Sequence, residues 1–136
     1  MNLPEIPLLD LLRQRMSWLN ARQAVLNQNV ANADTPGYEA HDLKPVDFEK
    51  LLQQTSATPQ FSPPLAITDP RHIAILKSQD AGFKEITATD TEANPTGNTV
   101  SLQDEMIKVA DTQAQYQAAA NLYSKAVGLL RTAIGH

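Results

Sequence analysis

Both ends of this 136-residue chain carry apolar residues in a heptad spacing. The intervals alternate between three and four residues, which is typical of a helix that packs along one seam. The first seam consists of Leu9, Leu12, Met16, Leu19, Gln23, Leu26, Val30 and Ala33, and the second of Leu102, Met106, Val109, Gln113, Tyr116, Ala120, Tyr123, Val127, Leu130 and Ile134. Neither line contains a charged residue. The pattern predicts a mainly α fold in which helices over residues 8–33 and 101–134 pair as an antiparallel coiled coil.

The second helix has sequence signals at both of its ends. Ser101 is expected to cap its first turn, where Asp104 and Glu105 add the negative charge that a helix N-terminus favours. Arg131 lies in the last turn, and Gly135 is expected to close the helix.

Residues 34–99 have a different composition. They hold seven of the nine prolines, and their five basic and ten acidic residues give a formal charge of −5. We expect a turn-rich and loop-rich acidic middle within a single domain of residues 1–136. Two short elements are expected inside it: a helix in VDFEKLLQQ, capped by Asp47, and a weak strand in GFKEITAT that a β-hairpin would use.

Composition excludes several classes of protein. The net charge of −4 gives no basic surface for a nucleic acid, and no run of about 20 apolar residues predicts a membrane span. The N-terminus lacks the basic region of a cleavable signal peptide. Only 5% of residues are aromatic, which suits helix seams better than a bulky core. A lone pair of these helices is expected to be marginally stable, so the chain is expected to be stable in an assembly.

The three histidines are the candidate residues for catalysis or metal binding. His41, His72 and His136 each lack a second ligand at a metal-like spacing, and the five glycines form no phosphate-binding loop. We therefore expect no catalytic residue, no metal site, no cofactor and no small-molecule substrate.

The first helical pattern ends in the string NVANADTPGY, which we call the joint (residues 29–38). Thr35 precedes a proline and is pushed out of the helical conformation, and Pro36-Gly37 fits the two central positions of a type II turn. The polar side chains of Asn29, Asn32 and Asp34 are suited to bonding the backbone groups exposed at the helix end. The expected joint residues are Asn29, Asn32, Asp34, Thr35, Pro36, Gly37 and Tyr38.

The string ANADTPGY, at the end of an amphipathic N-terminal helix, resembles the signature of the bacterial flagellar axial proteins, which make the rod, the hook and the hook-associated segments. The longer stretch WLNARQAVLNQNVANADTPGYEAHDL, and GNTVSLQDEM before the C-terminal helix, resemble those of the proximal rod proteins of the basal body. The resemblance covers both ends, about half of the chain. Glu39 departs from the pattern, because many relatives carry a basic residue after the tyrosine.

The resemblance implies a structural subunit whose terminal helices polymerise into the flagellar axle, which transmits torque to the distal rod and hook. It implies export through the flagellar type III apparatus without a cleaved signal, and a place in the periplasmic rod. The implied partners are further copies of the chain, a rod protein of the FlgC type and an adaptor of the FliE type. The seam residues and the joint are then the residues that carry function.

Two features of the helices admit two interpretations each. Gln23 and Gln113 are either tolerated polar residues or a pair that fixes the register of the helices. Trp18 shares a stripe with Arg15 and Arg22, and is either partly buried under their stems or a lateral contact between subunits. For Trp18 we favour the lateral contact, because the seam already occupies the other face.

Two other functions remain compatible with the pattern. One is a coiled-coil adaptor or type III secretion chaperone that never polymerises. The other is an enzyme carried on a helical hairpin, against which the missing catalytic constellation counts.

Overall fold

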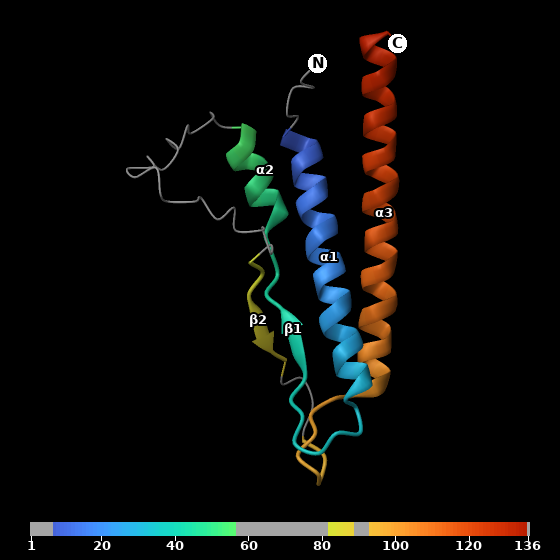
Figure 1. The fold of residues 1–136 in the computed structure, drawn as a ribbon. Helices are drawn as coiled ribbons and strands as arrows, with labels where there is room; N and C mark the ends of the chain where they lie inside the picture. The colour runs from blue at the N-terminus through green and yellow to red at the C-terminus, as the bar shows by residue number, and fades with distance from the viewer. Residues whose placement is uncertain (1–6, 57–81, 89–92, 136) are drawn as a thin grey trace, which may run out of the picture.

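A pair of long antiparallel helices forms the body of the molecule (Figure 1). The computed structural model describes residues 7–56, 82–88 and 93–135. The elements in chain order are α1 (Pro7–Ala31), β1 (His41–Leu43), α2 (Phe48–Ser56), β2 (Glu85–Thr87) and α3 (Leu102–Ile134). The two strands and α2 lie on the side of α1 that faces away from α3 (Figure 1). The expected fold class is confirmed: two long helices pack together, and the middle is rich in loops with a short helix and a two-stranded antiparallel sheet.

The local signals at the helix ends act as the sequence predicts. The Ser101 hydroxyl accepts the backbone N–H of Asp104 at 3.5 Å, and Gly135 closes α3 with a left-handed φ of 65°. Asp47 caps α2, because its carboxylate accepts the backbone N–H of Lys50 at 3.1 Å. The weak strand expected in GFKEITAT is β2, which pairs antiparallel with β1 in the register His41↔Thr87.

The buried side of α1 repeats every seven residues. Leu12, Leu19 and Leu26 are buried, and the last two are fully inaccessible. The other residues of the expected first seam, Leu9, Met16, Gln23, Val30 and Ala33, are all partly buried. The heptad line of α1 therefore faces the interior of the single chain.

The contact face of α3 is rotated from the line expected from the sequence. Its buried residues are Glu105, Thr112 and Ala119, again seven apart. Six residues of the expected line are partly buried beside them: Val109, Tyr116, Ala120, Tyr123, Val127 and Leu130. Four others, Leu102, Met106, Gln113 and Ile134, are exposed. Within the chain, small side chains and one carboxylate face α1, while several bulky apolar side chains of α3 face outward.

Trp18 is buried inside its own chain, so the lateral contact that we favoured for it is wrong. Its indole N–H donates to the carbonyl of Lys44 at 3.2 Å, and its ring meets Phe48 edge-on at 6.3 Å. It forms a core with Leu19, Leu43 and, on α3, Ala119. The Arg22 guanidinium lies 5.5 Å from the centre of the Trp18 ring, as the other interpretation expects. The segment after β1 folds back over this face of α1 and covers the indole.

Leu19 provides a direct test of this core. Because it is 0% exposed, Leu19→Ala is expected to lower the free energy of unfolding by about 2–5 kcal/mol through lost burial and a residual cavity. The matched control is Leu129→Ala on α3, where the side chain is 65% exposed and the expected change is within about 0.5 kcal/mol. Urea unfolding followed by circular dichroism measures both. Equal effects of the two substitutions would contradict this packing.

Candidate functional site

The joint begins where α1 ends and turns the chain toward β1. Asn32 closes the helix end, since its side-chain amide donates to the carbonyl of Gln28 at 2.8 Å. The Thr35 hydroxyl donates to the Asn32 side-chain oxygen at 3.2 Å. The backbone N–H of Tyr38 donates to the carbonyl of Thr35 at 3.3 Å, with Gly37 at a φ of 71° between them. This is the geometry of a type II turn, in which glycine takes the positive φ at low cost. The exposed side chains of the joint include Asp34, Thr35 and Pro36.

Asn29 is the centre of the joint, and it is fully buried. Its side-chain N–H₂ donates to the carbonyl of His41 at 2.6 Å and to the carboxylate of Glu105 at 2.9 Å. Its side-chain oxygen accepts the hydroxyl of Tyr38 at 3.2 Å and the backbone N–H of His41 at 3.1 Å. One amide therefore connects α1, the turn, β1 and α3 with both donors used.

The Asn29 amide takes the place of a neighbouring strand at the edge of β1. Backbone bonds join β1 to β2 on either side of His41: Ala88 donates to Ala40 and Lys44 donates to Lys84, both at 2.8 Å. In an antiparallel ladder the backbone groups of alternate residues point to opposite edges, so those of His41 point away from β2. Asn29 satisfies both of them. This pairing fixes the position of the sheet against α1.

Glu105 carries a buried negative charge at the contact between the helices. It is 2% exposed, and besides the amide of Asn29 it has the Lys108 ammonium at 3.2 Å. A buried carboxylate is tolerated when its oxygens are paired in this way. From the sequence we expected Glu105 only as a favourable charge in the first turn of α3.

A second loop, residues 94–100, closes the joint from the other side. The Gly37 N–H donates to the carbonyl of Thr96 at 3.0 Å, and the Thr99 N–H donates to the carbonyl of Tyr38 at 3.1 Å. The Thr99 hydroxyl accepts the Ala40 N–H at 2.9 Å. Gly97, at a φ of 79°, lies so close that a Cβ placed on it would be 3.5 Å from the Cα of Gly37. Two segments about 60 residues apart in sequence thus form one structural unit.

Asn98 is the buried residue of this second loop, at 2% exposure. Its side-chain N–H₂ lies 3.0 Å from the carbonyl of Asn32, 2.9 Å from that of Ala33 and 2.7 Å from that of Thr35. Its side-chain oxygen accepts the Val100 N–H at 2.7 Å. Asn98 thereby bonds the segment that directly follows α1 from a distant part of the chain.

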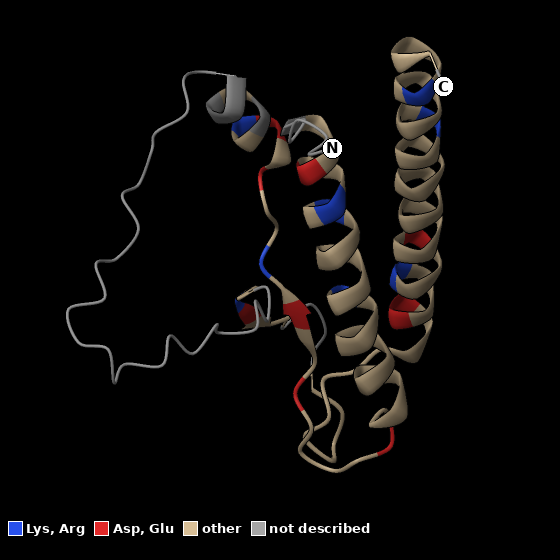
Figure 2. Ribbon diagram, turned by 45° about the horizontal axis from the view of Figure 1, so that its top comes forward, with Lys and Arg blue, Asp and Glu red and all other residues tan. Residues whose placement is uncertain are grey.

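The three arginines of α1 each bind a different element. Arg22 forms a two-pronged ion pair with Asp42 of β1, at 2.9 and 3.0 Å. Arg13 donates to the hydroxyl of Tyr123 on α3 at 3.1 and 3.2 Å, and Arg15 lies 5.5 Å from the ring centre of Phe48 at the start of α2. Figure 2 shows basic residues spaced along α1 and acidic residues along the segment beside it. The arginines fix α1 between its neighbours.

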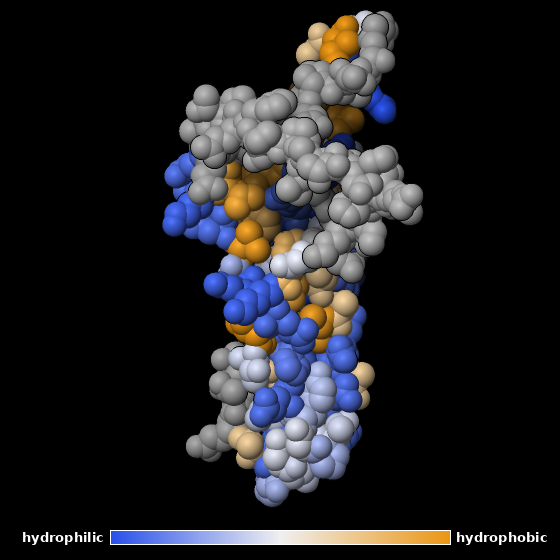
Figure 3. All heavy atoms as spheres, turned by 60° about the vertical axis from the view of Figure 1, so that its left-hand side comes forward, coloured by the Kyte–Doolittle hydropathy of each residue, from blue (hydrophilic) through white to orange (hydrophobic). Residues whose placement is uncertain are grey.

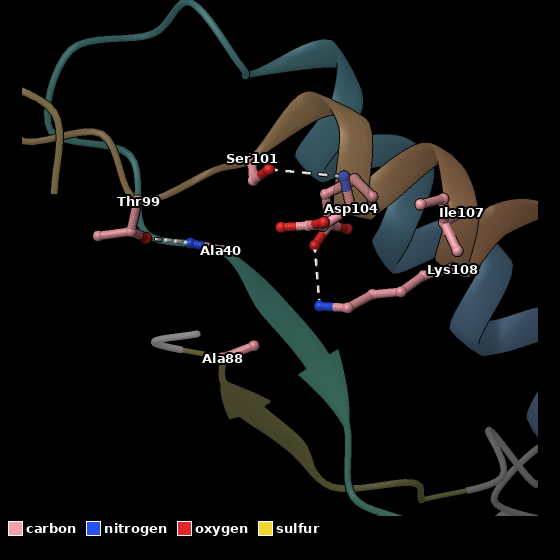
Figure 4. A pocket seen from close by; sticks show the side chains of 8 residues that line it. Ala40, Ala88, Thr99, Ser101, Asp104, Ile107 and Lys108 are labelled. Carbon is pink, nitrogen blue, oxygen red and sulfur yellow. Dashed lines mark hydrogen bonds and ion pairs between the residues drawn. The ribbon is translucent and has the colours of Figure 1, made fainter. Parts of the chain in front are cut away.

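A pocket of about 240 Å³ lies where the strands meet the start of α3 (Figure 4). It is lined by Ala40, Ala88, Thr99, Ser101, Asp104, Glu105, Ile107 and Lys108. The polar contacts drawn across it are those of Thr99 with Ala40, Ser101 with Asp104, and Lys108 with Glu105. These contacts hold the fold together. The cavity has room for several water molecules.

The histidines are not brought together with other metal ligands in the described part of the chain. His41 has Glu85 as its acidic neighbour at 3.5 Å, and His72 and His136 lie outside the described residues. Over residues 7–56, 82–88 and 93–135, no group of three or more histidine, cysteine, aspartate or glutamate side chains is placed to hold a metal ion. No helix within those ranges is long and apolar enough to span a bilayer.

Sequence reasoning missed the residues that close the joint from the C-terminal half. Gly97, Asn98 and Thr99 lie in GNTVSLQDEM, which we noted for its resemblance to rod proteins and not for a contact. The available signal was a glycine-asparagine pair directly before a capped helix, which predicts a turn but not its distant partner.

Comparison with known proteins gives the family. No family model matches the chain. The flagellar basal body rod protein FlgB of Bacillus subtilis (strain 168) is 31% identical over 123 residues, which cover 90% of this chain and 89% of the relative. The chain belongs to the FlgB family of flagellar basal body rod proteins.

Two further FlgB proteins support this membership. The FlgB of Agrobacterium fabrum is 33% identical over 86% of this chain and 84% of its own length. The FlgB of Escherichia coli (strain K12) is 31% identical over 76% of this chain and 75% of its own length. The similarity to FlgB extends well beyond the two ends on which the sequence resemblance rested, and it places the chain among structural proteins of the basal body rod.

Asn29 is expected to be among the most sensitive residues of the described structure. Asn29→Ala leaves the backbone groups of His41 and one oxygen of Glu105 buried without their partner, at a cost of about 1–3 kcal/mol for each group left unpaired. The exposed Asn121→Ala on α3 is the control, with a change within about 0.5 kcal/mol. Chemical unfolding measures both. A loss for Asn29→Ala as small as that of the control would contradict the bridging role.

Tyr38 makes the stability of the joint sensitive to alkaline pH. Burial raises the pKa of its phenol, and the nearby charges of Glu85 and Glu105 raise it further. In the unfolded chain the phenol ionises near pH 10, whereas in the folded chain it stays neutral to higher pH. The stabilisation is thus complete below pH ~10 and is lost as pH rises through the folded-state pKa.

The corresponding test compares the wild type with Tyr38→Phe across this pH range. The wild type is expected to be the more stable protein at about pH 8, and the difference in unfolding free energy is expected to shrink above pH ~10. Denaturant titrations at a series of pH values measure it. A difference that stays constant to about pH 11 would contradict the role assigned to the partly buried phenol.

Proposed function

We propose that this chain is a non-enzymatic structural subunit of the proximal rod of the flagellar basal body. Its terminal helices polymerise into the axle that transmits torque to the distal rod and hook. The observation that carries the proposal, together with membership of the FlgB family, is the exposed apolar surface of α3, which we call its outward face. A helix of 33 residues runs along one side of the molecule with large apolar side chains in the open.

The exposed apolar side chains of α3 lie along its full length, on both flanks of the side that packs against α1. They are Leu102, Met106, Ile107, Leu122, Leu129 and Ile134, with exposed fractions from 48% to 65%. At about 1.5 Å per residue α3 is roughly 50 Å long against about 37 Å for α1, so it continues past the start of α1 (Figure 1). Apolar side chains at this far end are open to solvent (Figure 3). Exposed apolar surface of this extent is typical of a face that other protein covers.

The expected seam residues of α3 have two different roles under this proposal. Val109, Tyr116, Tyr123, Val127 and Leu130 pack within the chain, while Leu102, Met106, Gln113 and Ile134 contact neighbouring subunits. Gln113 is exposed within the single chain. If Gln23 and Gln113 pair to fix the register of the helices, the Gln23 and Gln113 that bond each other therefore come from different subunits. Leu9, Leu12, Met16, Leu19, Gln23, Leu26 and Val30 of α1 hold the subunit together.

The joint gives this subunit its shape. Asn29 and the type II turn at Pro36-Gly37 direct the chain away from α1 and hold β1 at a fixed place beside it. In a rod this geometry presents the acidic middle to adjacent subunits while the helices form the tube. The neighbours under this proposal are copies of the chain, a FlgC-type rod protein and a FliE-type adaptor. The chain arrives in the rod by export through the flagellar apparatus, without a cleaved signal.

Met106 provides the test of the outward face. Met106→Glu introduces a charge at a side chain that is 60% exposed in the single chain, so the fold is expected to be unaffected. In an assembly the charge would be buried without a partner, which is costly enough to lower incorporation by roughly tenfold or more. The control, Met106→Leu, keeps an apolar side chain of similar volume and is expected to incorporate normally.

The readouts are swimming of a strain that carries only the variant and quantitative mass spectrometry of its purified basal bodies. The wild-type chain is expected in a fixed ratio to the other rod components, and the Met106→Glu chain is expected to be depleted. A wild-type chain that is absent from basal bodies and abundant in the cytoplasm would contradict the rod role and favour an adaptor or chaperone. Normal incorporation of Met106→Glu would contradict the assignment of this face.

A further inference from the structure

The carbonyl groups of the residues that follow α1 are bonded both by the local backbone and by a distant residue. Locally, Asn32 accepts the Thr35 N–H at 3.0 Å and Thr35 accepts the Tyr38 N–H at 3.3 Å. The last turn of any α-helix leaves carbonyls without intrahelical partners, and a glycine in the left-handed conformation just after the helix commonly satisfies them. After α1 the chain continues with Asn32 and Ala33, and its first positive-φ glycine is Gly37. The carbonyls of Asn32, Ala33 and Thr35 also converge on the side-chain amide of Asn98, at 3.0, 2.9 and 2.7 Å.

We propose that Asn98 is a latch that closes the joint and makes its closure conditional on the C-terminal half of the chain. The latch residue lies 63 to 66 positions after the carbonyls that it binds. The joint therefore has no complete set of partners until residues 94–100 dock against it. This device is built into the single chain and does not depend on the proposed assembly.

The chemistry of the latch requires asparagine. The N–H₂ group donates toward the three carbonyls while the side-chain oxygen of the same amide accepts the Val100 N–H at 2.7 Å. An aspartate has the same shape and keeps the acceptor for Val100, but it has no donor and would direct a negative oxygen at three carbonyl oxygens. Asn98→Asp therefore opens the latch without removing the local turn that leads into α3.

The contacts around Asn98 show which backbone groups report on closure. The Gly37 N–H reaches Thr96, and the Ala40 N–H reaches the hydroxyl of Thr99. Both acceptors belong to the loop that carries Asn98, and neither bond forms if this loop undocks. Amide exchange at Gly37 and Ala40 thus measures the latch directly, while amides in the middle of α3 measure the helix itself.

The experiment is amide hydrogen exchange of the full chain, measured by NMR for the wild type, Asn98→Asp and the control Asn94→Ala. Asn94 is an exposed asparagine in the same loop. Exchange at Gly37 and Ala40 is expected to accelerate by about tenfold or more in Asn98→Asp and to stay within about twofold of the wild type in Asn94→Ala. Equal protection of these amides in the wild type and Asn98→Asp would overturn the proposal, as would a wild type with no protection there.

If Asn98→Asp unfolds altogether, a measurement on the wild type alone tests the proposed latch. Native-state exchange at increasing denaturant is expected to show the Gly37, Ala40 and Thr99 amides opening together, with one denaturant dependence, because each of the three bonds joins the loop to the joint or to the residues just after it. Three separate dependences would show that the loop and the joint open independently, and this result would overturn the proposal.

Discussion

The burial of the Asn29 amide is the constraint on which the rest of the structure depends. An amide removed from water without hydrogen-bond partners is strongly destabilising, so its surroundings have to supply them. Here the partners come from the turn, β1 and α3 at once. Once these bonds form, the end of α1, the edge of the sheet and the start of α3 have one relative arrangement. The requirement to satisfy one buried side chain thus determines the direction in which the chain leaves the helix pair.

Around this polar centre, α1 contacts α3, β1 and α2, and β2 is joined to it only through β1. On one side its leucines meet α3, and on the other its tryptophan meets the segment of β1 and α2. The three arginines add two hydrogen-bonded contacts, to α3 and β1, and one cation–π contact, to α2. Because α1 is enclosed on both sides, the long free surface of the described structure belongs to α3. The enclosure of one helix and the exposure of the other suit a subunit that adds to a helical polymer.

Local sequence predicted the elements well, because their causes are local. Heptad spacing gave both long helices, Ser101 and Gly135 gave the ends of α3, and Pro36-Gly37 gave the turn. The face of α3 was not predictable in the same way. Two adjacent lines on that helix are compatible with packing, one with Leu102 and Met106 and one with Glu105, Thr112 and Ala119. The bond from Asn29 to Glu105 favours the second line, and the small side chains of Thr112 and Ala119 permit a close approach. The spacing of apolar residues does not predict which of the two lines packs against α1, because that depends on a buried polar pair.

The closure of the joint was beyond sequence reasoning for a related reason. The contacts of Asn98 span more than 60 residues, and an asparagine in a glycine-containing loop predicts a turn wherever it occurs. Trp18 shows the same limit, since only the return of the chain over α1 buries its ring. The resemblance to rod proteins drew attention to both GNTVSLQDEM and the joint but did not show that they touch.

Two buried asparagine amides hold the joint, and the exchange of their side-chain N–H₂ protons is the sharpest test of this role. NMR of the intact chain measures how fast these protons exchange with solvent for each asparagine. Slow exchange is expected for Asn29 and Asn98, whose side chains are buried and bonded, and fast exchange is expected for the exposed Asn94 and Asn121. Exchange of Asn29 and Asn98 as fast as that of the exposed pair would contradict this role.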